Sequence, residues 1–269
     1  MNTTRHNRIM SPIEAGILGL AVGDALGVPV EFSSRAALDN SPVTSMIAFY
    51  LRAHHGRVLT DEGVEIIHNI SSLTHAHPRS LVACVAYCTI AENILKGFRL
   101  DYAIEDGLKQ TAKYYRDKPR YSAELAHFKC MTFDNDGYPS IKPFRELPRE
   151  MIRSSGYVVD TLDASLWCLL NYEGYAETVL AAVNLGSDTD TTAAVCGGLA
   201  GLYYSQDHLP DETRIPQQWI ESLVNLPLIE EVCTRLEKAL YCVRGGEEGI
   251  IVSQLVHQQI EAEKKLSVN

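Results

Sequence analysis

The sequence predicts an all-α protein. Helix start signals recur along the chain, and apolar residues follow them at helical spacing. Convincing alternation of apolar and polar residues, which is typical of strands, is absent. Of the 269 residues, 46% are hydrophobic, which is enough for a substantial core in one large domain or two small ones.

The first predicted helix begins at residues 11–14, Ser-Pro-Ile-Glu, which combine an N-cap serine, a first-turn proline and a glutamate three residues after the cap. It carries Gly16, Gly19 and Gly23 on one face and ends at Gly27. Each glycine inside a helix costs roughly 1 kcal/mol. Three on one face therefore indicate that another backbone, or a ligand, approaches this face closely.

The later helices are predicted by similar caps and stops. A short helix should follow the Thr60 cap, and a better one should run from Pro78 to Gly97. The remaining boundaries are a start at Asp101 with an end near Tyr115, a start at Asp160, an end at Gly186, and starts at Asp188, Pro216, Leu228 and Gly249. Residues 129–148, rich in Asp, Gly and Pro, predict an irregular connection.

Composition excludes several classes of partner. The net charge is −10, and lysines and arginines form no cluster, which argues against nucleic acid and anionic membrane surfaces as partners. No apolar stretch is long enough to span a bilayer, and residues 1–10 lack the apolar core of a secretory signal. Seven scattered cysteines do not predict a disulfide framework. We expect a soluble, cytoplasmic protein whose partner is a small ligand or another protein.

The stretch with the clearest chemistry is residues 184–192, Asn-Leu-Gly-Ser-Asp-Thr-Asp-Thr-Thr, between two predicted helices. Asp188, Asp190 and the neighbouring hydroxyls suit a hard divalent cation, since magnesium prefers carboxylate oxygens together with hydroxyls and waters. Helix capping is the alternative, because Asp and Thr also satisfy the free N–H groups at a helix start. Taken alone, this stretch is better explained by capping, for which one carboxylate suffices.

Two further stretches contain candidate ligands. Asp24 and Glu31 lie near the C-terminal end of the glycine-bearing helix, where a negative charge is unfavourable unless a metal, a ligand or an arginine compensates it. The alternative is an exposed glutamate and an aspartate bonded to backbone. His75 and His77 lie just before the Pro78 helix, where by themselves they indicate capping and packing residues.

Four motifs together resemble the ADP-ribosylglycohydrolase family. In chain order they are Gly23–Gly27 with Pro29 and Glu31, Leu73–Pro78, Gly156–Leu162 and Ala182–Thr191. Each motif alone is weak evidence, but the four occur in the family's order over roughly residues 11–225. On these motifs the chain is identified as a member of the family.

The resemblance implies a single domain over residues 1–269, folded as an orthogonal multi-helix bundle that holds ADP-ribose beside two Mg²⁺ ions. It implies that Asp188, Asp190 and Thr191 are metal ligands and that Glu31 is the catalytic residue next to the scissile bond, where it acts as an acid or as a gate. It further implies that the substrate site is shaped by Asp24, His75, Gly156, Tyr157 and Asn184. The implied reaction is attack of water on the anomeric carbon of an ADP-ribosyl group carried by a protein or a small molecule.

The sequence departs from the family's pattern in its first third. The Thr-Asp-Asp-Thr-type motif and the Asn-Gly segment ending in Met-Arg are absent, so a block of helices is expected to be missing near residues 43–47. Residues 60–62, Thr-Asp-Glu, are a candidate replacement for the missing acidic pair, but they lie after this junction and helix capping explains them better.

Three oxygen ligands from one turn hold magnesium only weakly. The sequence therefore leaves three possibilities open. In the first, the chain is a hydrolase whose missing ligands come from elsewhere, such as another subunit. In the second, it is a protein that binds ADP-ribose or a nucleotide without catalysis. In the third, it is a truncated product without a role of its own.

Overall fold

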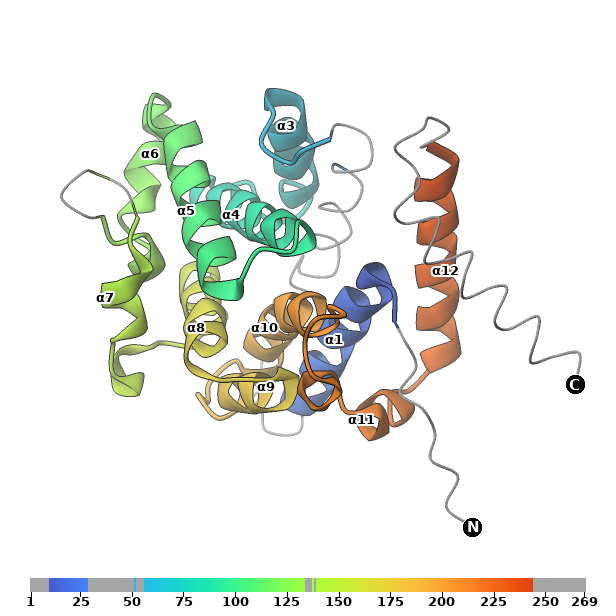
Figure 1. The fold of residues 1–269 in the computed structure, drawn as a ribbon. Coiled ribbons are helices and arrows are strands. Elements are labelled where there is room, and N and C mark those ends of the chain that lie inside the picture. Colours follow the sequence, from blue (N-terminus) through green and yellow to red (C-terminus); the bar gives the residue numbers. More distant parts are fainter. Residues whose placement is uncertain (1–9, 29–50, 52–55, 134–136, 138, 244–269) are drawn as a thin grey trace, which may run out of the picture.

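The computed structural model describes residues 10–28, 51, 56–133, 137 and 139–243, and within these ranges the regular elements are helices that cross at steep angles (Figure 1). An isolated bridge between Phe133 and Pro139 accompanies them. The all-α prediction is therefore confirmed. The helices are α1 (Pro12–Gly27), α3 (Asp61–Ser71), α4 (Pro78–Leu95), α5 (Leu100–Tyr115), α6 (Pro119–Leu125), α7 (Ile141–Arg145), α8 (Val158–Asn171), α9 (Tyr175–Val183), α10 (Thr189–Tyr204), α11 (Gln217–Glu221) and α12 (Leu226–Val243). Of the helices in these ranges, none combines the length and apolar character needed to cross a bilayer.

Helices α1 and α10 pack backbone to backbone at the centre of the molecule (Figure 1). A Cβ placed on Gly19 would lie 2.4 Å from the carbonyl oxygen of Gly197, and one on Gly23 would lie 2.2 Å from that of Ala193. From the other side, a Cβ on Gly201 would lie 2.2 Å from the carbonyl oxygen of Ala15. The close approach predicted from the glycine face is confirmed, and at these positions its partner is the backbone of α10.

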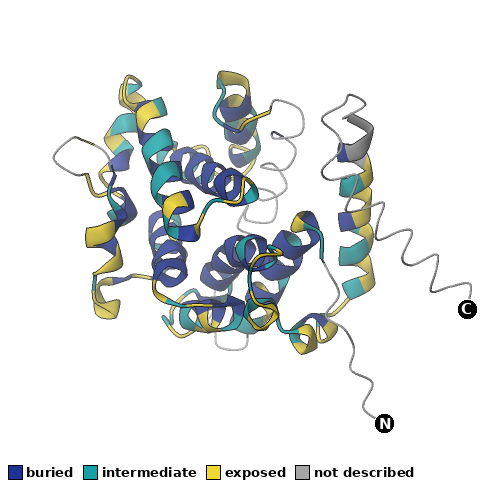
Figure 2. Cartoon of the chain, viewed as in Figure 1, coloured by how far each residue is buried: buried dark blue, intermediate teal, exposed yellow. Residues whose placement is uncertain are grey.

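The core lies along α1, α4, α8 and α10, whose residues are predominantly buried (Figure 2). These helices carry continuous runs of small and apolar side chains, such as Val195–Leu202 on α10. Exposed side chains gather on α12 and on the outer faces of α3 and α6 (Figure 2). The ends of α1 and α10 are thus fixed by the most deeply packed part of the fold.

Several predicted helix starts are confirmed at the level of the hydrogen bond. Ser11 Oγ accepts from the backbone N–H of Glu14 at 3.1 Å, and Pro12 opens α1. Thr60 Oγ1 accepts from Gly63 at 2.9 Å at the start of α3. These residues satisfy N–H groups that a helix start otherwise leaves without a partner.

Other boundaries differ from the prediction. Asp101 is not the cap of α5, which begins at Leu100, because its carboxylate is paired instead with Arg99 and with the N–H of Tyr102. Helix α8 begins two residues before Asp160, whose carboxylate accepts a hydrogen bond from Ser155. The connection over 129–148 contains a short helix, α7, and a 3₁₀ turn over Lys129–Met131. Helix α12 begins at Leu226 rather than Leu228, and the predicted start at Gly249 lies outside the described residues.

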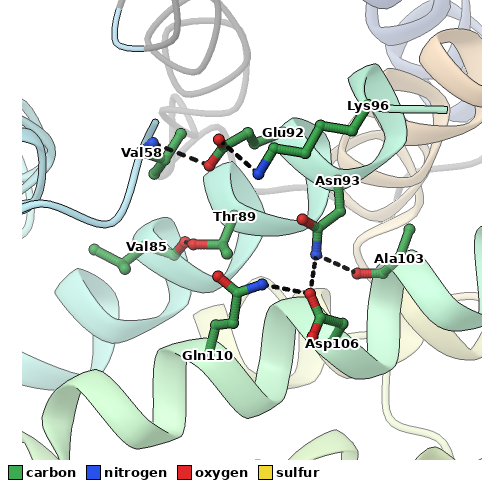
Figure 3. A network of polar contacts seen from close by, with 9 residues as sticks. All are labelled: Val58, Val85, Thr89, Glu92, Asn93, Lys96, Ala103, Asp106 and Gln110. Carbon is green, nitrogen blue, oxygen red and sulfur yellow. Dashed lines mark hydrogen bonds and ion pairs between the residues drawn. The ribbon is translucent and has the colours of Figure 1, made fainter. Parts of the chain in front are cut away.

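A buried polar network ties α4 to its neighbours (Figure 3). The Glu92 carboxylate accepts from the backbone N–H of Val58 at 2.9 Å and pairs with Lys96 at 2.8 Å. Next to it, the Asn93 amide donates to the carbonyl of Ala103 at 3.2 Å and to Asp106 at 3.1 Å. The network fixes the segment before α3 and the first half of α5 onto α4, because a buried polar group is costly without its partner.

His68 makes the stability of the fold dependent on pH. Its Nε2 lies 2.7 Å from the hydroxyl of Tyr115. Burial, reinforced by Lys118 and Arg120, lowers the pKa of His68 to about 4. The folded protein therefore favours neutral His68, and this contribution is complete above the ordinary pKa of 6.5 and is lost as pH falls towards 4.

We expect the free energy of unfolding to fall between pH 6.5 and 4, and to fall less steeply in His68→Gln, which cannot take up the proton. Urea unfolding of both proteins at several pH values measures the two slopes. Equal slopes across this range would show that His68 does not contribute.

Candidate functional site

The candidate site is built where the C-terminal end of α1 meets the N-terminal end of α10. The Thr189 hydroxyl donates to the carbonyl oxygen of Gly27 at 2.8 Å. A Cβ on Gly27 would lie 2.3 Å from Cα of Asp190, so only glycine allows the two ends to approach this closely. The early glycine-bearing segment and the late acidic turn are therefore side by side, as the four-motif resemblance requires.

The loop over residues 154–157 is hydrogen bonded to the acidic turn, residues 186–191, between α9 and α10. Gly186 and Ser187 both have left-handed backbone angles, with φ of +83° and +62°, and they redirect the chain between α9 and α10. The Asp188 N–H donates to the carbonyl oxygen of Ser154 at 3.0 Å, and the Ser154 hydroxyl donates to that of Gly186 at 2.6 Å. A Cβ on Gly156 would lie 2.2 Å from Oδ2 of Asp188. The predicted site residue Gly156 thus lies directly against the predicted metal ligand Asp188.

Three carboxylates influence one another at this junction. Burial raises the pKa of Asp188 above its ordinary value, and the neighbouring Asp190 carboxylate raises it further, while hydrogen bonding to Thr191 opposes the shift. Burial also raises the pKa of Asp24 at the end of α1, and again Asp190 adds to the effect. Negative charge is therefore concentrated where two helix ends meet, and a bound cation would relieve the repulsion among these carboxylates.

The carboxylate of Asp188 is only partly engaged by the start of α10, where hydrogen bonding to Thr191 acts to lower its pKa. Asp188 occupies the N-cap position of α10 without a side-chain capping bond, and its Oδ1 is buried with no hydrogen-bond partner in the described structure. Asp190 instead accepts from the N–H of Thr191 at 2.8 Å. Capping therefore does not account for the Oδ1 atom of Asp188, and a free carboxylate oxygen suits a hard cation.

The donor set is nevertheless partial. Asp188 and Asp190 supply carboxylate oxygens, and Thr191 supplies a hydroxyl in a buried position. Across the ranges that the structure describes, no group of three or more His, Cys, Asp and Glu side chains is arranged to hold a metal ion. Glu31 lies outside the described residues. These residues fit one side of a magnesium site rather than a complete one.

Tyr157 connects this junction to the start of α4. It occupies the N-cap position of α8, directly after Gly156, and its side chain is 45% exposed. The guanidinium of Arg79, in the first turn of α4, donates to the Tyr157 hydroxyl. The predicted site residue Tyr157 is thus one residue from the contact between Gly156 and Asp188.

The structure places the other predicted residues at the periphery. His75 is exposed in the loop before α4, where its Nδ1 lies 3.0 Å from the Thr74 hydroxyl. Asn184 is exposed at the C-cap of α9, and its carbonyl oxygen accepts from Arg149. Neither side chain is hydrogen bonded to the acidic turn within the part of the chain described. His77 is the N-cap of α4 and accepts from the Arg79 N–H at 3.2 Å, which confirms the capping interpretation of that histidine.

Three residues that the sequence did not single out shape the site: Arg79, Ser154 and Thr189. Thr189 lies between the two predicted acidic ligands, and the other two lie within two residues of a recognised motif. Their nearness to the motifs is a weak indication of a role in the site, because each acts through a contact between segments far apart in the chain.

Several characterised proteins are similar to this chain. The ADP-ribosylarginine hydrolase Tri1 of Serratia proteamaculans is 31% identical over 166 residues, which are 62% of this chain and 38% of that protein. Tri1 of Pseudomonas putida is 38% identical over 93 residues, 35% of this chain and 24% of the relative. The ADP-ribosyl-[dinitrogen reductase] glycohydrolase of Rhodospirillum rubrum is 26% identical over 138 residues, 51% and 37% of the two chains. The matched region is less than half the length of each relative.

A solved structure shares the fold. It is an ADP-ribosylglycohydrolase-related protein complex whose chain superposes with a TM-score of 0.56 at 20% identity, over 84% of this chain and 96% of that one. The family model of the ADP-ribosylglycohydrolases matches residues 1–64 and residues 46–245. Together these matches cover most of the chain, including all four motifs. The chain therefore belongs to the ADP-ribosylglycohydrolase family.

Proposed function

We propose that this protein hydrolyses the glycosidic bond between ADP-ribose and a protein side chain, with arginine as the first acceptor to test. The observation that carries the proposal is the junction of α1 and α10, where Asp188 keeps a buried, partnerless carboxylate oxygen beside Asp190. Arginine is chosen because two of the similar proteins are named ADP-ribosylarginine hydrolases.

The proposed cofactor is Mg²⁺, held by Asp188, Asp190 and Thr191. Asp24 lies near the same group of carboxylates, because the negative charge of Asp190 helps to raise the pKa of Asp24. A bound magnesium ion would polarise sugar oxygens or a water molecule. The chain's own contribution is to keep the acidic ligands in place through the Thr189–Gly27 and Ser154–Gly186 hydrogen bonds before any ligand arrives.

The proposed reaction is a displacement by water. Water attacks the anomeric carbon of the ADP-ribosyl group, the bond from that carbon to the side-chain nitrogen breaks, and the nitrogen takes a proton. Free ADP-ribose and unmodified arginine are the products. Glu31 remains the proposed catalytic residue that moves the proton, and Asp24, His75, Gly156, Tyr157 and Asn184 remain the proposed substrate-site residues.

A second candidate function is binding of ADP-ribose without turnover. It is favoured by the incomplete set of ligands, because among the described residues no three or more His, Cys, Asp or Glu side chains are grouped to hold a metal ion. The family matches in two stretches, residues 1–64 and 46–245; the loss of a block near residues 43–47, which lie outside the described residues, remains a prediction. Weak retention of magnesium would then leave the sugar bound but intact.

The experiment that separates the two candidates measures release and binding together. The protein is incubated with an ADP-ribosylated arginine peptide, with and without magnesium, and free ADP-ribose is quantified by chromatography. We expect slow release that requires magnesium, and none from a serine-linked peptide. Titration calorimetry with ADP-ribose is the second readout. Binding without release would establish the second candidate, and neither binding nor release would refute both.

A further inference from the structure

Arg79 is held from two sides by residues of other elements. Its Nε and Nη2 lie 2.7 Å and 2.6 Å from Oε2 of Glu124 on α6, and its Nη1 donates to the hydroxyl of Tyr157. Its guanidinium carbon also lies 5.9 Å from the centre of the Tyr157 ring, within the range of a cation–π contact. Because the guanidinium is planar, the bond to Glu124 fixes the direction in which Arg79 meets Tyr157.

The direction of the Arg79–Tyr157 hydrogen bond has a chemical consequence. A guanidinium has donors and no acceptor, so the oxygen of Tyr157 must accept. The hydrogen of the Tyr157 hydroxyl is then left to donate to another acceptor. The adjacent positive charge makes that hydroxyl a better donor, above all to an anionic oxygen.

The position of Tyr157 brings this donor to the candidate site. Gly156, the residue before it, lies against the carboxylate of Asp188. The Ser155 hydroxyl, which donates to Asp160 at 2.6 Å, also lies 3.3 Å from the Tyr157 N–H and accepts from it. The backbone of Tyr157 is therefore fixed by its own loop and its side chain by Arg79, while 45% of the residue stays exposed to a ligand.

We propose that Arg79 is a positioning residue that directs the Tyr157 hydroxyl towards an anionic oxygen of the ADP-ribosyl ligand, which its diphosphate supplies. The inference rests on the proposed function, because it assigns Tyr157 to the same ligand. Glu124 binds Nε and Nη2 of Arg79 and so keeps the guanidinium oriented towards Tyr157. A purely structural clamp between α4, α6 and α8 would instead change stability and leave ligand affinity untouched.

The test is a double-mutant cycle on ADP-ribose affinity, measured by titration calorimetry for wild type, Arg79→Ala, Tyr157→Phe and the double variant. We expect each single variant to raise the Kd about tenfold, the effect of losing one charge-assisted hydrogen bond. The double variant should bind no more weakly than the weaker single variant, because Arg79 acts only through the hydroxyl. Arg99→Ala is the matched control, since Arg99 is paired with Asp101 on the surface at the start of α5.

A spectroscopic readout accompanies the affinities. In protein labelled with 3-fluorotyrosine, the ¹⁹F resonance that is missing from Tyr157→Phe belongs to Tyr157, and it should shift in Arg79→Ala but not in Arg99→Ala. An unchanged Kd in Arg79→Ala, or single effects that multiply in the double variant, would overturn the inference while the proposed function stands. Absence of ADP-ribose binding by wild type would overturn this inference, and absence of ADP-ribose release as well would overturn the proposed function.

Discussion

Replacing Gly23 with alanine is expected to lower the free energy of unfolding by about 3 kcal/mol, near the upper end for overpacking a core. The new Cβ would lie 2.2 Å from the carbonyl oxygen and 2.7 Å from the carbonyl carbon of Ala193. Both are backbone atoms of α10, which cannot rotate away as a side chain can. Relief requires α1 and α10 to separate along the interface that carries the site, and urea unfolding measures the cost.

Gly16→Ala is the matched control on the same helix. Its Cβ would meet the end of the Leu202 side chain at 2.8 Å, and a leucine can change rotamer. Alanine also gains up to about 1 kcal/mol of helix propensity over glycine. We therefore expect a change within about 1 kcal/mol for this variant. Equal losses for the two variants would show that backbone contact between α1 and α10 is not what limits the interface.

If Asp188 is the proposed metal ligand, replacing it with asparagine is expected to reduce ADP-ribose release by about 100-fold or more, because losing a direct ligand costs more than losing its supporting contacts. The stability of the Asp188→Asn variant should not fall together with its activity. In the metal-free protein, Asp188 is half-buried, its Oδ1 atom is buried without a hydrogen-bond partner, and the carboxylate lies near Asp190. Removing its charge relieves that repulsion, so the unfolding midpoint without magnesium should stay constant or rise.

Asp101→Asn serves as the control for Asp188→Asn. It removes a carboxylate from another helix start, in the first turn of α5, where Asp101 is bonded to Arg99. Its release rate should equal that of wild type. A release rate for Asp188→Asn that matches wild type would exclude Asp188 as a ligand. A large fall in its unfolding midpoint would instead identify a structural role.

The sequence predicted the architecture well because helix starts and stops are local. The caps at Ser11 and Thr60 depend on residues three or fewer positions away. The glycine face of α1 also predicted close approach, but the pattern could not distinguish a backbone from a ligand. That distinction depends on α10, which lies more than 160 residues further along the chain.

The candidate site was predictable in part. The sequence could not show whether Asp188 is a metal ligand or a helix cap, because aspartate serves in both roles. The distinction came from the buried Oδ1 and from the contact with Gly156. Arg79 and Ser154 were not predicted, since each acts on a residue at least 30 positions away. No periodicity or spacing signals contacts of this kind.

Hydrogen exchange of the protein with and without ADP-ribose and magnesium tests most directly whether the meeting point of α1 and α10 is the ligand site. We predict that ligand slows exchange at the end of α1, in residues 154–157 and in the acidic turn over 186–191. Exchange in α12, on the far side of α1, should not change (Figure 1). Protection confined to other segments, with exchange of the acidic turn unaltered, would contradict this assignment.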